Sequence, residues 1–524
     1  MSNGADDGAA EVATVDRLRA LRQLASGNAS QADRVGTSHA KGRSEALRHV
    51  DGLTDAGTFF EIGTFATFAE PVTQKGENHY GGGIVGGHAT ISGRPVTVAV
   101  DDGEVSGRAT GKSSRLFDMA LSRRNPYIEI AHGSSEPSFG GRLETGTLSA
   151  KTFRAEPAFP YLLQRNRFIP VVSAVLGDAF GSSSFTAGLC DFLVQKEGTH
   201  LGLVRPLSTE GDVFASPSAP VENKVSVANG EVDMVVRTDG EAYGAVRKFL
   251  SFLPSYSGGR LPIEEDDLAM NYDNGVAALV PSRRNRAYDM KDVIRRLGDP
   301  DSFFELKPNF ARNIITGFGR VSGMPVGFIA NAPMHSAGAL TPDCCLKATS
   351  FVCMCDAFGI PMVFLIDTPG FLVSVSAERD RAMIRSMTMM QAIALATVPK
   401  ISVVVRKGFG LAFVIMGGNR RSDLLVAWPG AEIGFMDPPV AANVLFEPQM
   451  RELPEEERPA FIANKVNQLA VDFEPYGVAA SMVIDEIIEP GTTRQMIAEY
   501  FFTELNSDGR TRVQSPLANW PRWS

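Results

Sequence analysis

Two apolar, β-branched runs, each followed by a glycine-containing turn and a helix-length apolar stretch, stand out along the chain. One covers residues 398–416 (VPKISVVVRKGFGLAFVIM) and the other covers residues 169–188 (IPVVSAVLGDAFGSSSFTAG). Each predicts a strand, a tight turn and a helix. Backbone N–H groups at the start of a helix have no intrahelical acceptor, so they can hold an oxygen that gains negative charge.

The two stretches belong to an internal duplication. Pro170 and Pro399, like Gly181 and Gly410, are 229 residues apart. Strands alternate with helical stretches in each half, which predicts tandem α/β units with largely parallel sheets and right-handed crossovers. Three further pairs of segments match in the same order: DAGTFFEI (55–62) with DPDSFFEL (299–306), GHATISGRPV (87–96) with GFGRVSGMPV (317–326), and DFLVQKEGTHLGLV (191–204) with DLLVAWPGAEIGFM (423–436). In the second pair, the Ser-Gly dipeptide predicts a hairpin turn.

The same patterns predict three parts. Residues 1–43 form an N-terminal tail that carries one amphipathic helix, residues 44–270 form the first α/β domain, and residues 271–524 form the second. The join falls in a Pro-, Gly- and Asp-rich stretch, which is the composition of a linker.

Composition narrows the function classes. The chain has 524 residues and a net charge of −9, so a nucleic-acid partner, which requires a basic surface, is not expected. The apolar runs are shorter than the ~20 residues of a membrane span, and the N-terminus lacks a signal-peptide core, so we expect a cytoplasmic protein without a membrane partner. The five cysteines lack zinc-site spacing, so we expect buried thiols and no metal site.

Four polar residues are candidates for a functional site from their positions alone. His132 follows a strand at residues 126–130, at the edge where α/β proteins bind ligands, so it is either a general acid or base or an ordinary surface-loop histidine. Asp367 ends a strand and more simply caps a turn. Arg108 and Lys112 lie in SGRATGKSS, which has the composition of a phosphate loop without Walker spacing, so nucleotide hydrolysis is not expected.

The second half has a recognisable order of motifs. GFGRVSGMPVGFIAN is followed by CDAFGIP, DTPGFL, VPKISVVVRKGFGLAF and AWPGAEIGFM. Over about residues 44–520 the chain resembles the carboxyltransferase (β) subunit of biotin-dependent acyl-CoA carboxylases, of the propionyl-CoA carboxylase type. The resemblance implies a crotonase-type (ClpP/crotonase) fold in each half. It also implies a hexamer of stacked dimers, in which the first half of one subunit holds acyl-CoA and the second half of its neighbour holds biotin.

In that family the paired turns form two oxyanion holes. By resemblance the hole for the acyl thioester enolate falls on Gly181 and Ser182, and the hole for the biotin carbonyl falls on Leu411 and Ala412. Val414 falls on the position that selects the acyl group. The chain departs from the family where each hole has a Gly-Gly pair, because Ser182 and Leu411 replace the second glycines.

The resemblance also implies further contacts. The family's Asp-Ser-Gly-Gly-Ala-Arg segment corresponds to AHGSSEPSFGGRLETG (131–146), and Arg108 and Lys112 lie where the family binds CoA phosphates. The remaining substrate contacts implied are Gly410, His132, Gly140, Gly141 and Arg142.

The resemblance predicts transfer of a carboxyl group from carboxybiotin to the α carbon of an acyl-CoA through an enolate. Because no Met-Lys-Met biotinylation motif and no ATP-binding glycine-rich loop occurs in the sequence, we expect a separate biotin carboxylase/biotin carrier subunit as partner. Two alternatives stay open: a biotin-independent decarboxylase or lyase of a CoA thioester, and a catalytically silent paralogue that assembles with an active subunit.

Overall fold

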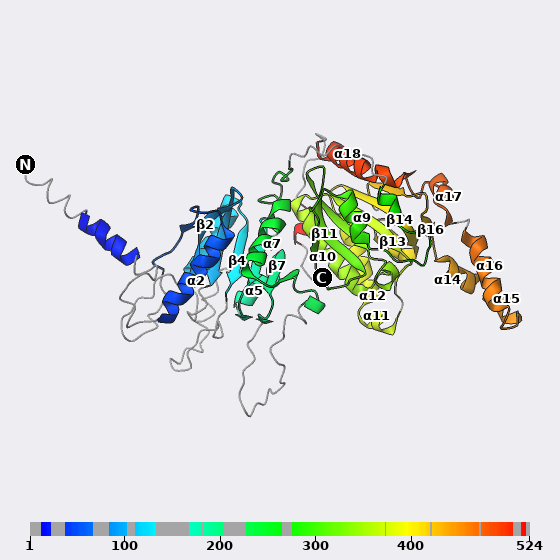
Figure 1. The fold of residues 1–524 in the computed structure, drawn as a ribbon, viewed down its shortest axis with the longest axis horizontal. Helices are drawn as coiled ribbons and strands as arrows, with labels where there is room; N and C mark the ends of the chain where they lie inside the picture. The colour runs from blue at the N-terminus through cyan, green and yellow to red at the C-terminus, as the bar shows by residue number, and fades with distance from the viewer. Residues whose placement is uncertain are drawn as a thin grey trace, which may run out of the picture. The chain divides into compact units, whose positions relative to one another are not determined.

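The computed structural model describes residues 12–22, 37–66, 83–101, 110–132, 167–180, 182–202, 227–264, 275–372, 374–419, 422–470, 473–506 and 515–519. Within them the chain forms two compact units, Met1–Leu250 and Ser251–Ser524 (Figure 1). The predicted boundaries at residues 43 and 270 stay predictions.

The first unit contains a seven-stranded mixed sheet with the order β1-β2-β3-β4-β5-β7-β9. The first three strands pair antiparallel and the others pair parallel. Its strands are β1 (Phe60–Glu61), β2 (Ile84–Ile91), β3 (Arg94–Asp101), β4 (Tyr127–Ala131), β5 (Val171–Val175), β7 (Phe192–Lys196) and β9 (Met234–Val236). A small parallel pair joins β6 (Ala179–Phe180) and β8 (Leu201–Gly202). The helices named here are α2 (Thr37–Leu53), α3 (Thr110–Arg123), α5 (Ser182–Leu189) and α7 (Asp239–Phe252).

The second unit repeats this order as β10-β11-β12-β13-β14-β15-β17, with β16 also paired to β14. Its strands are β10 (Phe304–Leu306), β11 (Ile314–Val321), β12 (Met324–Asn331), β13 (Met362–Thr368), β14 (Lys400–Phe409), β15 (Leu424–Ala427), β16 (Glu432–Gly434) and β17 (Glu486–Ile487). Its helices include α8 (Gly275–Ala278), α9 (Met290–Leu297), α10 (Pro342–Phe358), α11 (Val375–Arg379), α12 (Ala382–Leu395), α13 (Gly410–Ile415), α14 (Pro438–Leu445), α15 (Glu447–Glu452), α16 (Arg458–Ala470), α17 (Pro475–Ala480) and α18 (Thr493–Asn506).

Helices cover both faces of the second sheet. Successive side chains of a strand point to opposite faces, so Ile315 and Phe318 of β11 face different layers. Ile315 belongs to the core formed with α9 and α18, whereas the ring of Phe318 lies 5.0 Å from that of Phe351 in α10. Helix α9 buries Met290, Val293, Ile294 and Leu297, the spacing of one helix face.

Aspartate side chains make the same backbone contacts in both units. Asp55 accepts hydrogen bonds from the N–H groups of residues 92 (2.9 Å) and 93 (2.8 Å), and Asp299 accepts from residues 322 and 323 at the same distances. Asp191 accepts from the N–H at the start of β5 (3.0 Å), and Asp423 accepts from the N–H at the start of β14 (2.8 Å). These equivalent contacts are the structural counterpart of the duplicated sequence.

The two predicted Ser-Gly hairpins are confirmed. Ser92 and Gly93 have φ of 51° and 75°, and Ser322 and Gly323 have the same values, as two-residue type I′ turns require. A Cβ on Gly323 would lie 1.9 Å from the carbonyl oxygen of Glu264, so the second turn also needs glycine for space. All five cysteines are buried free thiols, as expected.

The clamp on the second hairpin predicts a stability effect. Asp299 is 8% exposed and also accepts from Arg494 Nη2 at 2.6 Å. We expect Asp299→Asn to lower the free energy of unfolding by about 2 to 3 kcal/mol, because it removes a charged acceptor from a buried cation. Denaturant titration measures this. Asp292→Asn, which breaks an exposed pair with Arg295, is the control and should change it by about 0.5 kcal/mol. Equal losses would show that the clamp contributes no more than a surface pair.

Candidate active site

The second unit carries an uncapped helix start at the end of its central strand. The predicted strand and helix are both present: strand β14 ends at Phe409, and α13 begins at Gly410 with no separate turn residues between them. The N-cap is Phe409, which makes no side-chain hydrogen bond to the helix. Gly410 has φ of +61°, the left-handed region in which glycine is favoured, and a Cβ there would lie 3.2 Å from the oxygen of Phe435. The first N–H groups of α13 are therefore not capped by a side chain.

The structure brings the predicted residues of this turn together. Leu411 follows Gly410 and is 47% exposed, whereas Ala412 is fully buried. Val414 is half-buried on the next turn of the same helix. Because Leu411 lies within the helix, its backbone N–H survives the replacement of glycine, and its side chain occupies the surface beside the helix start.

A buried carboxylate fixes the strand that leads to this turn. Asp367, at the end of β13, is fully buried and accepts hydrogen bonds from Tyr288 Oη (2.9 Å), Arg406 Nε (3.1 Å) and the N–H of Lys407 (3.2 Å). The pairing of β13 with β14 shifts register between Ile366 and Thr368, beside this contact. Asp367 therefore positions the last residues of β14, and it has no exposed surface with which to contact a substrate.

The partners of Asp367 are themselves held. Arg406 Nη1 donates to the carbonyl oxygen of Arg286 at 2.8 Å, and its guanidinium lies 4.9 Å from the centre of the Tyr288 ring. Burial raises the pKa of Asp367, and the charges of Arg406 and Lys407 oppose that shift. Burial, followed by the charge of Asp367, raises the pKa of Tyr288. The hydroxyl thus stays a donor to the carboxylate. The sequence predicted that Asp367 caps a turn, whereas its side chain binds Tyr288, Arg406 and the backbone of β14.

The corresponding turn of the first unit is described only in part. Strand β5 leads through β6 to α5, which begins at Ser182. Gly181 and the side chain of Ser182 lie outside the described residues. The first oxyanion hole at Gly181 and Ser182 therefore stays a prediction.

His132 lies in a chain of hydrogen-bonded side chains at the end of β4. Its Nε2 is 2.5 Å from Glu45 Oε2, and its Nδ1 is 2.8 Å from His49 Nε2. His49 Nδ1 is in turn 2.6 Å from Tyr243 Oη. A carboxylate only accepts, so the protons are ordered from Tyr243 through His49 and His132 to Glu45.

This chain uses both ring nitrogens of His132 and both of His49. Burial, with the charge of His132 adding to it, lowers the pKa of His49 to about 4, and burial raises the pKa of Tyr243 to about 12. A neutral imidazole and a neutral phenol are the forms that the hydrogen bonds need. His132 therefore ties the end of β4 to α2 and α7, and its predicted substrate contact stays a prediction.

Lys112 is buried, and its Nζ lies 3.3 Å from Glu61 Oε1. A phosphate would have to compete with that carboxylate for the ammonium group. The predicted contact of Lys112 with CoA stays a prediction. The other predicted contacts Arg108, Gly140, Gly141 and Arg142 lie outside the described residues.

Sequence reasoning missed the partners of these groups. Tyr288 and Arg406 are distant in sequence from Asp367, and Glu45 and Tyr243 are distant from His132. The signal for His49 was present, since it lies in α2 between the buried Ala46 and Val50, where an apolar side chain is typical.

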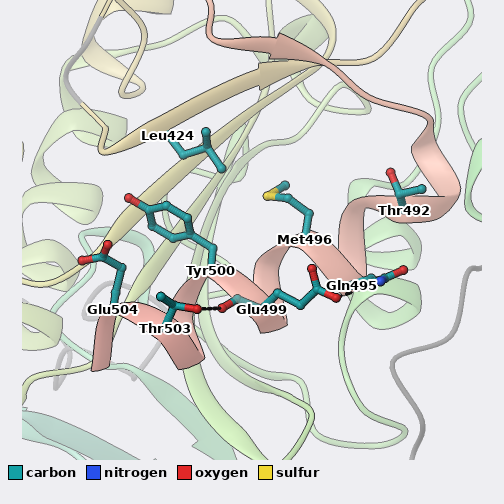
Figure 2. A pocket seen from close by; sticks show the side chains of 8 residues that line it. All are labelled: Leu424, Thr492, Gln495, Met496, Glu499, Tyr500, Thr503 and Glu504. Atoms are coloured by element: carbon teal, nitrogen blue, oxygen red, sulfur yellow. Dashed lines mark hydrogen bonds between the residues drawn. The ribbon is translucent and has the colours of Figure 1, made fainter. Parts of the chain in front are cut away.

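The second unit also has a surface cavity, which lies away from the start of α13. It has a volume of about 520 Å³ and is open to solvent (Figure 2). Leu424 at its edge pairs with Ile401, near the start of β14, so the cavity lies at the opposite end of the strands from α13. Its polar groups are partly satisfied along α18, where Thr503 Oγ1 donates to the carbonyl of Glu499 (2.9 Å) and Gln495 Nε2 donates to Glu499 Oε1 (2.8 Å). It is not part of the candidate site. The lining residues are Leu424, Thr492, Gln495, Met496, Glu499, Tyr500, Thr503 and Glu504.

The described residues contain no group of three or more His, Cys, Asp or Glu side chains that could hold a metal ion. In the same part of the chain, no helix combines the length and the apolar composition needed to cross a bilayer.

The buried Asp367 predicts a destabilising substitution. We expect Asp367→Asn to lower the free energy of unfolding by about 3 kcal/mol, because it leaves the buried Arg406 without a counter-charge. Tyr288→Phe removes one hydrogen bond to the same carboxylate and should cost about 1 kcal/mol. Denaturant titration of both variants measures the difference. Equal costs would show that the charge of Asp367 is not what holds this contact.

The neutral state of His49 predicts a pH effect. Since its pKa falls from 6.5 in the unfolded chain to about 4 in the fold, the unfolded state binds the extra proton between these values. Stability should therefore fall by about 2 kcal/mol, allowing for solvent screening, as the pH is lowered from 6.5 to 4. His49→Gln preserves a donor and an acceptor without titrating, so it should lose less over that range. The same pH slope in both proteins would refute the assignment.

The chain is similar to known proteins over nearly its whole length. Residues 37–512 match the family described as the carboxyl transferase domain. The putative propionyl-CoA carboxylase beta chain of Bacillus subtilis (strain 168) is 32% identical over 488 residues, which cover 90% of this chain and 92% of that protein. The methylmalonyl-CoA carboxyltransferase 12S subunit of Propionibacterium freudenreichii subsp. shermanii is 29% identical over 520 residues, or 97% of each chain.

A solved structure extends the similarity to the fold. The crystal structure of transcarboxylase 12S, described by its hexamer assembly and by bound methylmalonyl-coenzyme A and methylmalonic acid, is 28% identical, with a TM-score of 0.81. It covers 95% of this chain, and the match covers 96% of that chain. The predicted α/β fold of two tandem crotonase-type domains is thereby confirmed. Because the family match spans most of the sequence, and a relative above 30% identity aligns with nine-tenths of it, this chain belongs to the carboxyl transferase family.

Proposed function

We propose that this chain is the carboxyltransferase subunit of a biotin-dependent acyl-CoA carboxylase. It moves a carboxyl group from carboxybiotin to the α carbon of an acyl-CoA. The observation that carries this proposal is the uncapped start of α13, where Gly410 adopts the left-handed conformation beside the buried Ala412. In the first unit β6 is likewise followed by a helix, α5, which begins at Ser182, and we propose that its start is the second such site.

The chemistry requires two sets of backbone donors. Carboxybiotin releases CO2 and leaves a strong base, which takes the α proton of the thioester. The enolate then attacks CO2. N–H groups held in advance stabilise the developing charges more effectively than water, because they need no reorganisation. In this assignment Gly181 and Ser182 hold the enolate oxygen, while Leu411 and Ala412 hold the biotin carbonyl. Val414 contacts the acyl end.

The remaining assignments follow the resemblance of the sequence to the family. Arg108 and Lys112 would meet the CoA phosphates, and the Gly140–Arg142 segment and His132 would line the substrate. The biotin is carried by a separate biotin carboxylase/biotin carrier subunit. Because the transcarboxylase 12S structure is described as a hexamer, we propose a homohexamer for this chain too, acting in the cytoplasm.

A second candidate is a biotin-independent decarboxylase or lyase of a CoA thioester. The exposed Leu411 favours it, because an isobutyl group stands beside the helix start where biotin would approach. Such an enzyme needs only the first helix start.

Transfer of label tests the proposal. The purified chain is incubated with ATP, labelled bicarbonate, a biotin carboxylase with its carrier, and a panel of acyl-CoA thioesters. We expect acid-stable label in at least one carboxyacyl-CoA. No label with any thioester would overturn the proposal, and loss of CO2 from a carboxyacyl-CoA without biotin would support the lyase instead.

Two substitutions of Leu411 separate the contribution of its backbone N–H to activity from that of its side chain. Leu411→Gly and Leu411→Pro both remove the isobutyl group, but only proline removes the N–H, and proline is tolerated in the first turn of a helix. We expect Leu411→Pro to lose about 10² to 10³ in kcat for transfer. Leu411→Gly should match or exceed the parent. Equal rates for the two variants would show that this N–H does not contact the reacting oxygen.

A further inference from the structure

Arg284 joins two carboxylates beside the start of α13. Its Nε lies 2.9 Å from Glu432 Oε2, and its Nη2 donates to Asp437 Oδ2 at 3.1 Å. The side chains of Arg284, Glu432 and Asp437 are 29%, 24% and 16% exposed. Burial raises the pKa of Glu432, and the charge of Arg284 opposes that rise. A guanidinium group has several donors in fixed directions, so one arginine can hold both carboxylates at the same time.

Both carboxylates belong to the stretch 432–437, which borders the start of α13. Glu432 lies in β16, which pairs with the last residues of β14. Three residues later, the carbonyl oxygen of Phe435 would lie 3.2 Å from a Cβ on Gly410. The stretch ends at Asp437, directly before α14. Its two ends are thus held by one guanidinium group, and its middle lies against the first residue of α13.

The same guanidinium group contacts the residue that precedes α13. Its carbon atom Cζ lies 5.7 Å from the centre of the Phe409 ring, within the range of a cation–π interaction. Phe409 is the N-cap of α13, and its ring also meets that of Phe473 at 5.8 Å and nearly at a right angle. Arg284 therefore contacts both of the backbone segments that flank Gly410.

The turn at residues 283–286, which carries Arg284, is itself anchored. The N–H of residue 286 donates to the carbonyl oxygen of residue 283 at 3.1 Å. Arg406 Nη1 donates to both carbonyl oxygens of this turn, at 2.8 Å for residue 286 and 3.3 Å for residue 283. Because Arg406 is the partner of the buried Asp367, a continuous series of polar contacts leads from the end of β13, through this turn, to the segment beside Gly410.

Capping of α14 does not account for the orientation of Asp437. An aspartate at the N-cap of a helix usually accepts a hydrogen bond from one of the first backbone N–H groups, which stabilises the helix. Asp437 is the N-cap of α14, yet its side chain makes no such bond. Pro438 and Pro439 have no N–H to offer, and the carboxylate does not bind that of Val440 either. It accepts from Arg284 instead.

We propose that Arg284 is a positioning residue for the biotin half of the reaction. It holds the stretch 432–437 and the ring of Phe409 so that the first N–H groups of α13 point at the biotin carbonyl. This inference rests on the proposed function, in which Leu411 and Ala412 hold that carbonyl. Donors stabilise a developing charge most effectively when they are aimed before it forms, so a less ordered start of α13 lowers the rate of transfer. The role of Arg284 is to orient these groups, and no contact with the substrate is assigned to it.

Steady-state kinetics test the proposal. The full-length protein is assayed with a biotin carboxylase, its carrier and the thioester that gives the fastest transfer. We expect Arg284→Met, which keeps the length of the side chain but removes its charge, to lower kcat about tenfold, less than the loss of a whole donor. The KM for the thioester should change by less than about twofold, because that ligand is assigned to the first unit. Arg284→Lys should restore part of the lost kcat, since it keeps the charge but not the fork of donors.

Two controls separate positioning from stability. Arg295→Met removes an exposed ion pair with Asp292 in the same unit and should leave kcat unchanged. All variants are assayed at a temperature at which circular dichroism shows them to be folded, so that a lower kcat does not come from unfolded protein. An unchanged kcat in Arg284→Met overturns the proposal, and so does an equal loss in Arg295→Met.

A double substitution tests whether Arg284 acts through the N–H groups of α13. Leu411→Pro already lacks one of the two N–H groups that Arg284 is proposed to aim. Arg284→Met should therefore lower kcat less in the Leu411→Pro background than in the parent, whereas the effects of independent sites add. The same loss in both backgrounds contradicts the proposal.

The label transferred by the parent protein separates this inference from the proposed function. If the parent transfers label and Arg284→Met has the same kcat, the role of Arg284 fails and the proposed function stands. If the parent transfers no label to any thioester, the proposed function fails, and the inference fails with it.

Discussion

Carboxylates that accept backbone N–H groups hold the strand ends of both units in register. A hydrogen bond to an ionised acceptor is stronger than one between neutral groups. Each such bond joins a carboxylate oxygen to a backbone nitrogen, so it fixes the position of the backbone. Asp191 and Asp423 sit at equivalent places in the two sheets, as do Asp55 and Asp299. The turn that presents the helix start of α13 can be held only if β14 ends at a defined place. Asp367 provides this constraint through the N–H of Lys407.

The two units hold the carboxyl ends of the equivalent strands β4 and β13 with different side-chain contacts. The strands β4 and β13 begin equivalently, since the N–H of Tyr127 donates to Pro170 and that of Met362 donates to Pro399, both at 2.9 Å. At their carboxyl ends, β13 carries a buried anion paired with Arg406, whereas the residue after β4 is His132, which is hydrogen-bonded to His49 and Glu45. Protonation of His49 would break this chain, because its Nδ1 could then no longer accept from Tyr243 Oη. The equivalent strand ends are therefore held by an ion pair in one unit and by a chain that contains two histidines in the other.

Much of the fold could be predicted from the sequence, because the relevant signals are local. The run at residues 398–416 specified β14 and α13, and the Ser-Gly dipeptides specified both hairpins. The side-chain partners could not be predicted, since they join distant positions: Tyr243 lies 194 residues from His49, and Asp367 lies 79 residues from Tyr288. Such contacts depend on the packing of the whole unit.

Leu411 stands where the family has glycine, and this replacement does not disturb the backbone of α13. The conformation that requires glycine occurs at Gly410, with φ of +61°, where another residue would cost about 1 to 2 kcal/mol. Leu411 lies inside α13 with ordinary helical backbone, which any L-residue adopts. The substitution therefore leaves the direction of the N–H groups unchanged and reduces only the space beside them. A donor set that persists while its approach narrows can still stabilise a developing charge. The side chain of Leu411 instead restricts the shape of the ligand that can bring its oxygen to the N–H groups of α13.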